Sequence, residues 1–278
     1  MTLISLVCFT TYTFFLDVMP KVVISLGIYS AQFVAVIGLW LVFNIFFNYI
    51  RCVWVGPGSP PENLDDERKA LSIDDPEIRD RRNGQIYRWC DKCNRVKPMR
   101  AHHCTLCGVC VLKMDHHCPW VNNCVGYRNH KHFLLFLFYL WLGSGFYLVC
   151  APFETWRALI GLPMSQTHLI GTVLSFSAWF ASACFLAWSA FLLLTNQSTI
   201  EFYANCFEGA NKVICLAVTG QFGNPFNLGA LRNFREVFGL NRCSTFWTWC
   251  LPSAASPPGD GVIFPQCYRP SLFADDMT

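Results

Sequence analysis

The chain is poor in charge. Aspartate, glutamate, lysine and arginine make up 14% of its 278 residues, whereas soluble domains usually carry about 25%. It also lacks a long basic run, which argues against nucleic acid as a partner, and it shows no internal repeat of solenoid length. Hydrophobic residues make up 53% of the chain. These features predict an integral membrane protein.

Three uncharged apolar stretches are long enough to cross a bilayer, which takes roughly 20 residues in a helix. They are residues 22–49, 133–153 and 169–195. A fourth stretch, residues 2–16, is of marginal length, and we expect Asp17, Pro20 and Lys21 to end it. The pattern therefore predicts four transmembrane helices, with a short first helix paired with the second.

The first stretch has two other interpretations. It could be the apolar region of a signal peptide, but no positive residue precedes it and no clear small-residue cleavage site follows it. It could also belong to a chain that is shortened at its amino terminus. A membrane helix is the preferred interpretation.

Lysine and arginine are unevenly spread among the loops. Residues 51–131 hold 14 of the 21 basic residues, and the segment after Thr195 holds five more. The two remaining loops hold one each, Lys21 and Arg157. Because excess Lys and Arg marks the cytoplasmic side, we expect both termini and the long central loop to be cytoplasmic.

The sequence divides into five segments. They are residues 1–50 with transmembrane helices one and two, a cytoplasmic linker at 51–89, a cysteine-rich domain at 90–132, transmembrane helices three and four at 133–195, and a cytoplasmic carboxy-terminal region at 196–278. Residues 62–82 are typical of a solvated linker, and residues 228–240 fit an amphipathic helix. The tail from Ser253 is rich in Pro, Ser and Gly, and we expect it to be poorly ordered.

Seven of the 16 cysteines lie between Cys90 and Cys124, together with four histidines. Clustered C-x-x-C pairs indicate metal ligands rather than a disulfide framework, and zinc takes four ligands of this kind. Two zinc ions would use eight of these eleven residues and leave three over. The segment has little apolar content, so we expect metal to supply its folding energy. Spacing alone also fits a purely structural zinc scaffold.

One run within this segment has the composition of a catalytic centre. A carboxylate, two imidazoles and a thiol follow one another as Asp115, His116, His117 and Cys118. A carboxylate can orient an imidazole, and the imidazole can take the proton of a thiol that then acts as a nucleophile. The run ends 15 residues before the apolar stretch that begins at Phe133. It is therefore expected at the membrane surface, where a lipid-tailed reagent would present its reactive end.

This pattern resembles the DHHC family of protein S-acyltransferases. The similarity is carried by Asp115-His116-His117-Cys118, His102-His103-Cys104, Cys118-Pro119-Trp120-Val121-Asn122-Asn123-Cys124-Val125-Gly126 and Asn129-x3-Phe133. It implies an all-α integral membrane protein with four transmembrane helices. It also implies a cytoplasmic zinc-binding cysteine-rich domain between helices two and three.

The resemblance assigns roles to individual residues. One zinc site would use Cys90, Cys93, His103 and Cys110, and the other Cys104, Cys107, His117 and Cys124. Cys118 would be the acylated nucleophile, His116 its general base and Asp115 the group that orients His116. The cofactor-binding group would comprise Arg88, Lys97, His102, Trp120, Thr199 and Asn233.

The expected roles within the binding group differ. The residues that match CoA phosphate contacts are Arg88, Lys97 and His102. Trp120 would pack near the thioester. Thr199 lies in Ser198-Thr199-Ile200-Glu201, which resembles the family's Thr-Thr-x-Glu motif with serine in first place, and would support Asp115. Asn233 lies in a segment similar to the family's carboxy-terminal motif and would be its polar anchor.

The resemblance implies protein S-acyltransfer. A long-chain acyl group, typically palmitoyl, would pass from acyl-CoA to Cys118 and then to cysteine thiols of membrane-associated proteins, in two covalent steps. Two zinc ions would be structural, because protein atoms fill all of their ligand positions. The family's usual membranes are the endoplasmic reticulum and the Golgi, and the resemblance leaves room for an accessory subunit.

Two alternatives stay open. Gly143, Ser144 and Gly145 in the third span could leave space for the acyl chain, or they could allow close helix packing. A catalytically silent zinc scaffold and a RING-type ubiquitin ligase would also place eight Cys and His ligands in one segment. Neither accounts for a thiol such as Cys118 that is left over beyond the eight ligands.

Overall fold

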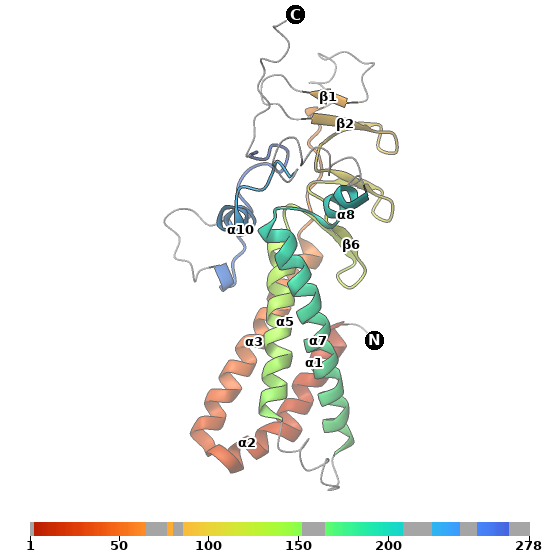
Figure 1. Cartoon of the computed structure of the whole chain (residues 1–278). Coiled ribbons are helices and arrows are strands. Elements are labelled where there is room, and N and C mark those ends of the chain that lie inside the picture. The colour runs from red at the N-terminus through yellow and green to blue at the C-terminus, as the bar shows by residue number, and fades with distance from the viewer. Residues whose placement is uncertain are drawn as a thin grey trace, which may run out of the picture. The chain divides into compact units, whose positions relative to one another are not determined.

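The computed structural model describes residues 3–64, 77–79, 86–151, 165–207, 224–239 and 249–266. The chain forms two compact units, and Figure 1 labels most of their helices and some of their strands. The membrane unit comprises Met1–Arg51 and His132–Ser189, and the cysteine-rich unit comprises Cys52–Lys131 and Ala190–Thr278. Most of the linker expected at 62–82 lies outside the described residues, as does the loop that contains Arg157.

In the described part of the chain, four helical runs are long and apolar enough to cross a membrane (Figure 1). The first joins α1 (Leu3–Thr13), a π-helical turn (Phe14–Val18) and α2 (Met19–Leu26), and the others are α3 (Ile28–Trp54), α5 (His130–Cys150) and α7 (Gln166–Leu194). Many of their large apolar side chains are exposed, such as Tyr29, Phe33 and Phe180, as expected of helices that face lipid. The four predicted spans are confirmed.

The boundary between the first two spans differs from the prediction. The first helix does not end at Asp17, Pro20 or Lys21 but continues to Leu26, which gives it 24 residues. Pro20 lies near the start of α2, directly after the π turn, and such local adjustments satisfy the backbone groups that a proline leaves free. The helix breaks at Gly27, whose φ of 80° costs a glycine little.

Small residues bring the helices of the membrane unit close together. A Cβ on Gly38 of α3 would lie 3.4 Å from the ring of Phe146 on α5, and a Cβ on Gly145 of α5 would lie 3.1 Å from the indole of Trp179 on α7. Gly145 therefore serves close helix packing, which is one of the two interpretations of its segment.

Among its described residues, the cysteine-rich unit contains one three-stranded and two two-stranded antiparallel sheets. Its strands are β1 (Glu77–Arg79), β2 (Ile86–Cys90), β3 (Arg95–Pro98), β4 (His102–Cys104), β5 (Val109–Val111), β6 (His116–Cys118) and β7 (Asn123–Val125). β2 pairs with β1 and β3, β4 with β5, and β6 with β7, all antiparallel. Two helices, α8 (Thr199–Phe207) and α10 (Ala230–Phe238), follow the last span. The cysteine-rich domain lies between the second and third spans, as predicted, and α10 lies within the helix expected at 228–240.

One apolar core joins distant parts of the cysteine-rich unit. Its buried members are Leu64, Tyr87, Val96, Ala101, Leu112, Tyr127, Phe226, Val262 and Phe264. Val262 and Phe264 are 6% and 4% exposed, and Tyr127 donates a hydrogen bond to the carbonyl of Pro258. The expectation of a poorly ordered tail is therefore wrong for residues 253–266. Two of its apolar side chains, Val262 and Phe264, pack into a core that other segments of the unit form. That core also adds to the folding energy that metal was expected to supply alone.

Candidate active site and metal centres

Eight cysteine and histidine side chains gather in two groups of four. The groups are Cys90, Cys93, His103 and Cys110, and Cys104, Cys107, His117 and Cys124, with the ligand atoms of each within 4.8 Å of one another. These are the sets that the resemblance implied. Each group takes two cysteines from the turn of one hairpin and a cross-strand pair from the next, because His103 lies opposite Cys110 and His117 opposite Cys124.

The donor set of each group suits zinc. Three thiols and one imidazole fill four tetrahedral positions, and zinc–sulfur bonds of about 2.3 Å place neighbouring sulfurs of such a site roughly 3.8 Å apart. The Sγ atoms of Cys107 and Cys124 lie 3.5 Å apart, and those of Cys93 and Cys110 lie 3.6 Å apart. The residues therefore fit closed zinc sites, which would hold consecutive hairpins together.

His116 and Cys118 lie on the face of β6 opposite His117. Successive side chains of a strand point to opposite faces, so His117 can reach the metal group only by leaving its two neighbours together on the other side. His116 Nδ1 and Asp115 Oδ2 are 2.7 Å apart, and the imidazole is also hydrogen-bonded to Cys118. Carboxylate, imidazole and thiol thus form a relay that contains no metal ligand.

The hydrogen bonds within the relay shift the pKa values of its three side chains toward their charged forms. Burial acts to lower the pKa of His116, but the hydrogen bonds to Asp115 and Cys118 raise it to about 9. Burial acts to raise the pKa of Asp115, but the hydrogen bond from His116 and nearby positive charge lower it to about 2. Burial also acts to raise the pKa of Cys118, and the hydrogen bond from His116 brings it below its usual range. The site therefore favours a thiolate paired with an imidazolium, and the thiolate is the nucleophilic form of cysteine.

The first turn of α8 holds the carboxylate of Asp115. The backbone amide of Thr199 donates to Asp115 Oδ1 at 2.6 Å, so Thr199 supports the carboxylate through its main chain. Ser198 and Glu201 form a capping box, in which each backbone amide donates to the other side chain at 2.8 and 3.2 Å. Ser198 supplies the hydroxyl that this capping box needs. The replacement of the motif's first threonine by serine therefore keeps the capping box intact.

Comparison with known proteins agrees with this geometry. Residues 84–205 match the model of the DHHC palmitoyltransferase family. Over 224 residues the chain is 32% identical to "Probable protein S-acyltransferase 15" of Arabidopsis thaliana, an overlap of 78% of this chain and 82% of that relative. The chain belongs to the DHHC palmitoyltransferase family.

Two longer DHHC relatives match over a smaller share of their length. "Palmitoyltransferase ZDHHC15" of Rattus norvegicus is 38% identical over 191 residues, which are 66% of this chain and 51% of the relative. "Palmitoyltransferase ZDHHC2" of Danio rerio is 42% identical over 188 residues, which are 65% of this chain and 47% of the relative. The chain spans about half the length of these two relatives.

Two asparagines of the DHHC domain tie the β6–β7 hairpin to the end of α3. Asn123 Nδ2 donates to the carbonyl of Cys52 at 3.1 Å. Asn129 Nδ2 donates to the carbonyls of Val55 and Cys124 at 3.1 and 2.8 Å. Carbonyls at the end of a helix lack partners within the helix, so these asparagines satisfy them and fix the strand that carries Cys118.

Three of the expected CoA contacts lie close together. Arg88 on β2 and Lys97 on β3 are cross-strand partners, and like charges placed opposite each other are unfavourable by themselves. Burial lowers the pKa of His102, Glu201 opposes this, and the positive charges of Lys97 and Arg88 lower it further. Trp120, in the β6–β7 turn, is 66% exposed. Arg88 and Lys97 thus place two positive charges near His102.

Asn233 has a different environment. Its Nδ2 donates to the carbonyl of Leu194 at 2.7 Å and to Asn227 Oδ1 at 2.8 Å, and its Oδ1 accepts from the amide of Leu228 at 2.9 Å. These contacts lie within the protein, which fits the role of a polar anchor. Arg100, which is buried, and Glu201, which is partly buried, form an ion pair that no sequence pattern had indicated. The S-x-x-E pattern of the capping box could have indicated the glutamate.

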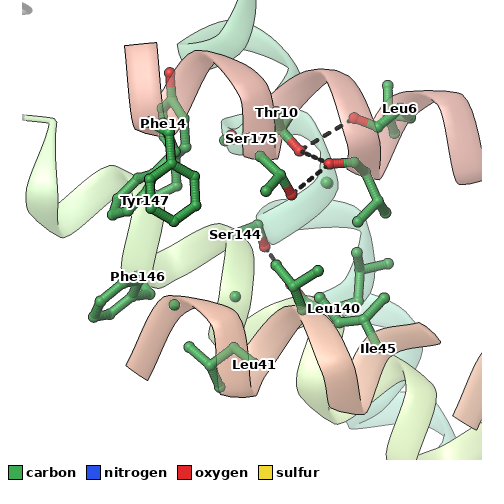
Figure 2. A pocket seen from close by; sticks show the side chains of 17 residues that line it. Leu6, Thr10, Phe14, Leu41, Ile45, Leu140, Ser144, Phe146, Tyr147 and Ser175 are labelled. Carbon is green, nitrogen blue, oxygen red and sulfur yellow. Dashed lines mark hydrogen bonds between the residues drawn. The ribbon is translucent and has the colours of Figure 1, made fainter. Parts of the chain in front are cut away.

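The membrane unit of this DHHC protein has a half-open, largely apolar cavity of about 70 Å³ (Figure 2). Figure 2 shows Phe14, Phe146 and Tyr147 gathered at one end of it. The ring centroid of Phe14 lies 5.8 Å from that of Phe146 and 6.0 Å from that of Tyr147. Gly143 and Ser144 also line the cavity, which favours the first interpretation of these two residues.

Proposed function

We propose that the chain is a protein S-acyltransferase that carries a long-chain acyl group, typically palmitoyl, on Cys118. The observation that carries the proposal is the relay of Asp115, His116 and Cys118, whose carboxylate and imidazole are 2.7 Å apart. A zinc scaffold that uses six thiols and two imidazoles has no use for a seventh thiol with a lowered pKa. The donor is acyl-CoA, and the acceptors are cysteine thiols of membrane-associated proteins.

The chemistry takes two balanced steps. In the first, the Cys118 thiolate attacks the thioester carbonyl carbon, the carbon–sulfur bond to CoA breaks, and the imidazolium of His116 gives its proton to the departing CoA thiolate. In the second, a substrate thiol gives its proton to His116, and its sulfur attacks the carbonyl carbon of acyl-Cys118. The bond from that carbon to Cys118 Sγ breaks, and Cys118 leaves as the thiolate. Asp115 holds Nδ1 of His116, so the other ring nitrogen serves the thiols.

The two ends of acyl-CoA have separate binding groups in this proposal. Part of the hydrocarbon chain occupies the apolar cavity of the membrane unit (Figure 2). The CoA phosphates bind to Arg88 and Lys97 with His102 beside them, because the strand register places these two cations side by side. Trp120 packs near the thioester.

Two zinc ions, one in each group of four ligands, complete the proposed enzyme. Their chemistry is structural, because each ligand set is already full. Both termini and the cysteine-rich unit are cytoplasmic, which the excess of Lys and Arg in residues 51–131 supports. The membranes are those of the endoplasmic reticulum or Golgi. The proposed domain limits are 1–50, 51–89, 90–132, 133–195 and 196–278, and the first transmembrane helix extends to Leu26.

Autoacylation tests the proposal. The protein, purified in detergent, is incubated with an alkyne-labelled long-chain acyl-CoA, and wild type is compared with Cys118→Ser before and after hydroxylamine. We expect label on wild type that hydroxylamine releases and that Cys118→Ser lacks. The same assay in membranes of expressing cells tests for an accessory subunit. The absence of Cys118-dependent label in both settings, on zinc-loaded protein, would refute the proposal.

A further inference from the structure

Arg100 is a buried cation outside the proposed relay. Its side chain is 1% exposed. Its guanidinium donates to the two carboxylate oxygens of Glu201 at 2.6 and 2.7 Å and to the side-chain and main-chain oxygens of Asn196 at 3.1 and 3.0 Å. A bidentate pair of this kind fixes direction as well as distance. Arg100 therefore determines where the carboxylate of Glu201 lies.

Glu201 connects this cation to the relay. It is the third residue of α8 and closes the capping box with Ser198. Between them stands Thr199, whose backbone amide donates to Asp115 Oδ1 at 2.6 Å. The orientation of that amide depends on the first turn of α8, which the capping box fixes. A displacement of Glu201 would thus move the donor that holds Asp115.

Two aromatic rings from the carboxy-terminal region hold the guanidinium itself. Its Cζ lies 4.4 Å from the ring centroid of Phe226 and 4.9 Å from that of Phe264. Phe264 is 4% exposed, and the Nζ of Lys113, which pairs with Glu236, lies 5.4 Å from its ring centroid. Cation–π contacts of this kind gain strength where water is excluded. The segment around Phe264 therefore packs directly on the group that fixes Glu201.

We propose that Arg100 is a positioning residue for the acyl-transfer relay and that Phe264 holds Arg100 in place. Arg100 fixes Glu201, the capping box fixes the first turn of α8, and the Thr199 amide fixes Asp115. The carboxy-terminal segment thereby helps to position Asp115 in the relay. The role in acyl transfer rests on the proposed function of Cys118.

The first test uses Arg100→Lys, which keeps the charge but loses the bidentate geometry, and Phe264→Leu, which keeps an apolar side chain but loses the ring. Single-turnover autoacylation should slow by roughly 10- to 100-fold in Arg100→Lys, because a misplacement of about 1 Å can cost about a hundredfold. Phe264→Leu should slow it in the same direction by less. Zinc content and detergent melting curves identify any variant that fails to fold.

A second readout needs no acyl-CoA. The pH at which iodoacetamide alkylates Cys118 at half its maximal rate should rise in Arg100→Lys, because a loosened Asp115 supports His116 less well. Arg95→Lys, the same exchange at a partly exposed arginine that faces Glu62 at 4.0 Å, serves as the matched control and should change neither readout. If wild type takes no label but the alkylation profile still shifts, the proposed function fails while the positioning role stands.

A double-mutant comparison separates positioning from general stability. Combined with Asp115→Asn, Arg100→Lys should slow autoacylation by less than about twofold further, because residues that act through one contact do not add. Equal fold-losses with and without Asp115→Asn would overturn the proposal. So would folded variants of Arg100 and Phe264 that acylate and alkylate as wild type does.

Discussion

Replacing Gly143 should shorten the acyl chain that the protein accepts. Gly143 lines the cavity, and a Cβ at this position would lie 3.0 Å from Ile45 Cδ1, the flexible end of a side chain. A tyrosine ring placed here would fill part of the cavity, whose far end is at present closed by Phe14 and Tyr147. The end of the cavity would thereby move by one helical turn.

The size of the effect follows from this shift. Gly143 and Tyr147 are four residues apart on α5, which is about 6 Å along the helix. An extended chain advances roughly 1.2 Å per bond, so about five carbons would lose their place. At about 0.8 kcal/mol per buried CH₂ the loss is at most about 4 kcal/mol, or nearly a thousandfold. We expect at least a tenfold fall in the preference for a 16-carbon over a 12-carbon acyl-CoA.

Competition between the two acyl-CoAs for label on Cys118 measures the preference. Gly145→Ala is the matched control, because Gly145 contacts Trp179 of α7 rather than the cavity, and it should leave the preference unchanged. Gly143→Val provides a smaller step if the tyrosine variant is unstable. An unchanged preference in a folded, acylated Gly143→Tyr protein would contradict the assignment of this cavity to the acyl chain.

Three further predictions concern the relay, the metal and the CoA contacts. Burial raises the pKa of Cys118 and the hydrogen bond from His116 lowers it, so His116→Ala should move the pH for half-maximal alkylation upward; an unchanged profile would show that His116 does not stabilise the thiolate. Elemental analysis should find two zinc ions per wild-type or Cys118→Ser chain and one or fewer in Cys124→Ala, and equal zinc in all three would contradict the second site. Arg88→Gln and Lys97→Gln should each raise the KM for acyl-CoA roughly three- to fivefold, the range of exposed charge pairs, without changing Cys118 alkylation, and an unchanged KM would remove them from the CoA site.

Local patterns predicted much of the site. Two-residue gaps between cysteines allow one turn to offer two sulfurs, so the spacing from Cys90 to Cys124 indicated two metal groups. The alternation of side chains along a strand then separates His117 from His116 and Cys118. The four spans were equally visible, because lipid requires long uncharged helices. The end of the first helix could not be predicted from the sequence, because the π turn that accommodates Pro20 has no simple sequence pattern.

The sequence by itself determined the membrane class and the metal-binding pattern and pointed to Cys118 as the candidate nucleophile, because each shows in local composition or spacing. Only the tertiary structure decided that Arg100 pairs with Glu201 and stacks on Phe264, and that the tail supplies part of the core. Contacts between residues more than a hundred positions apart leave no periodicity or spacing in the chain. They depend on where folded elements meet, and the support of Asp115 by α8 depends on them as well.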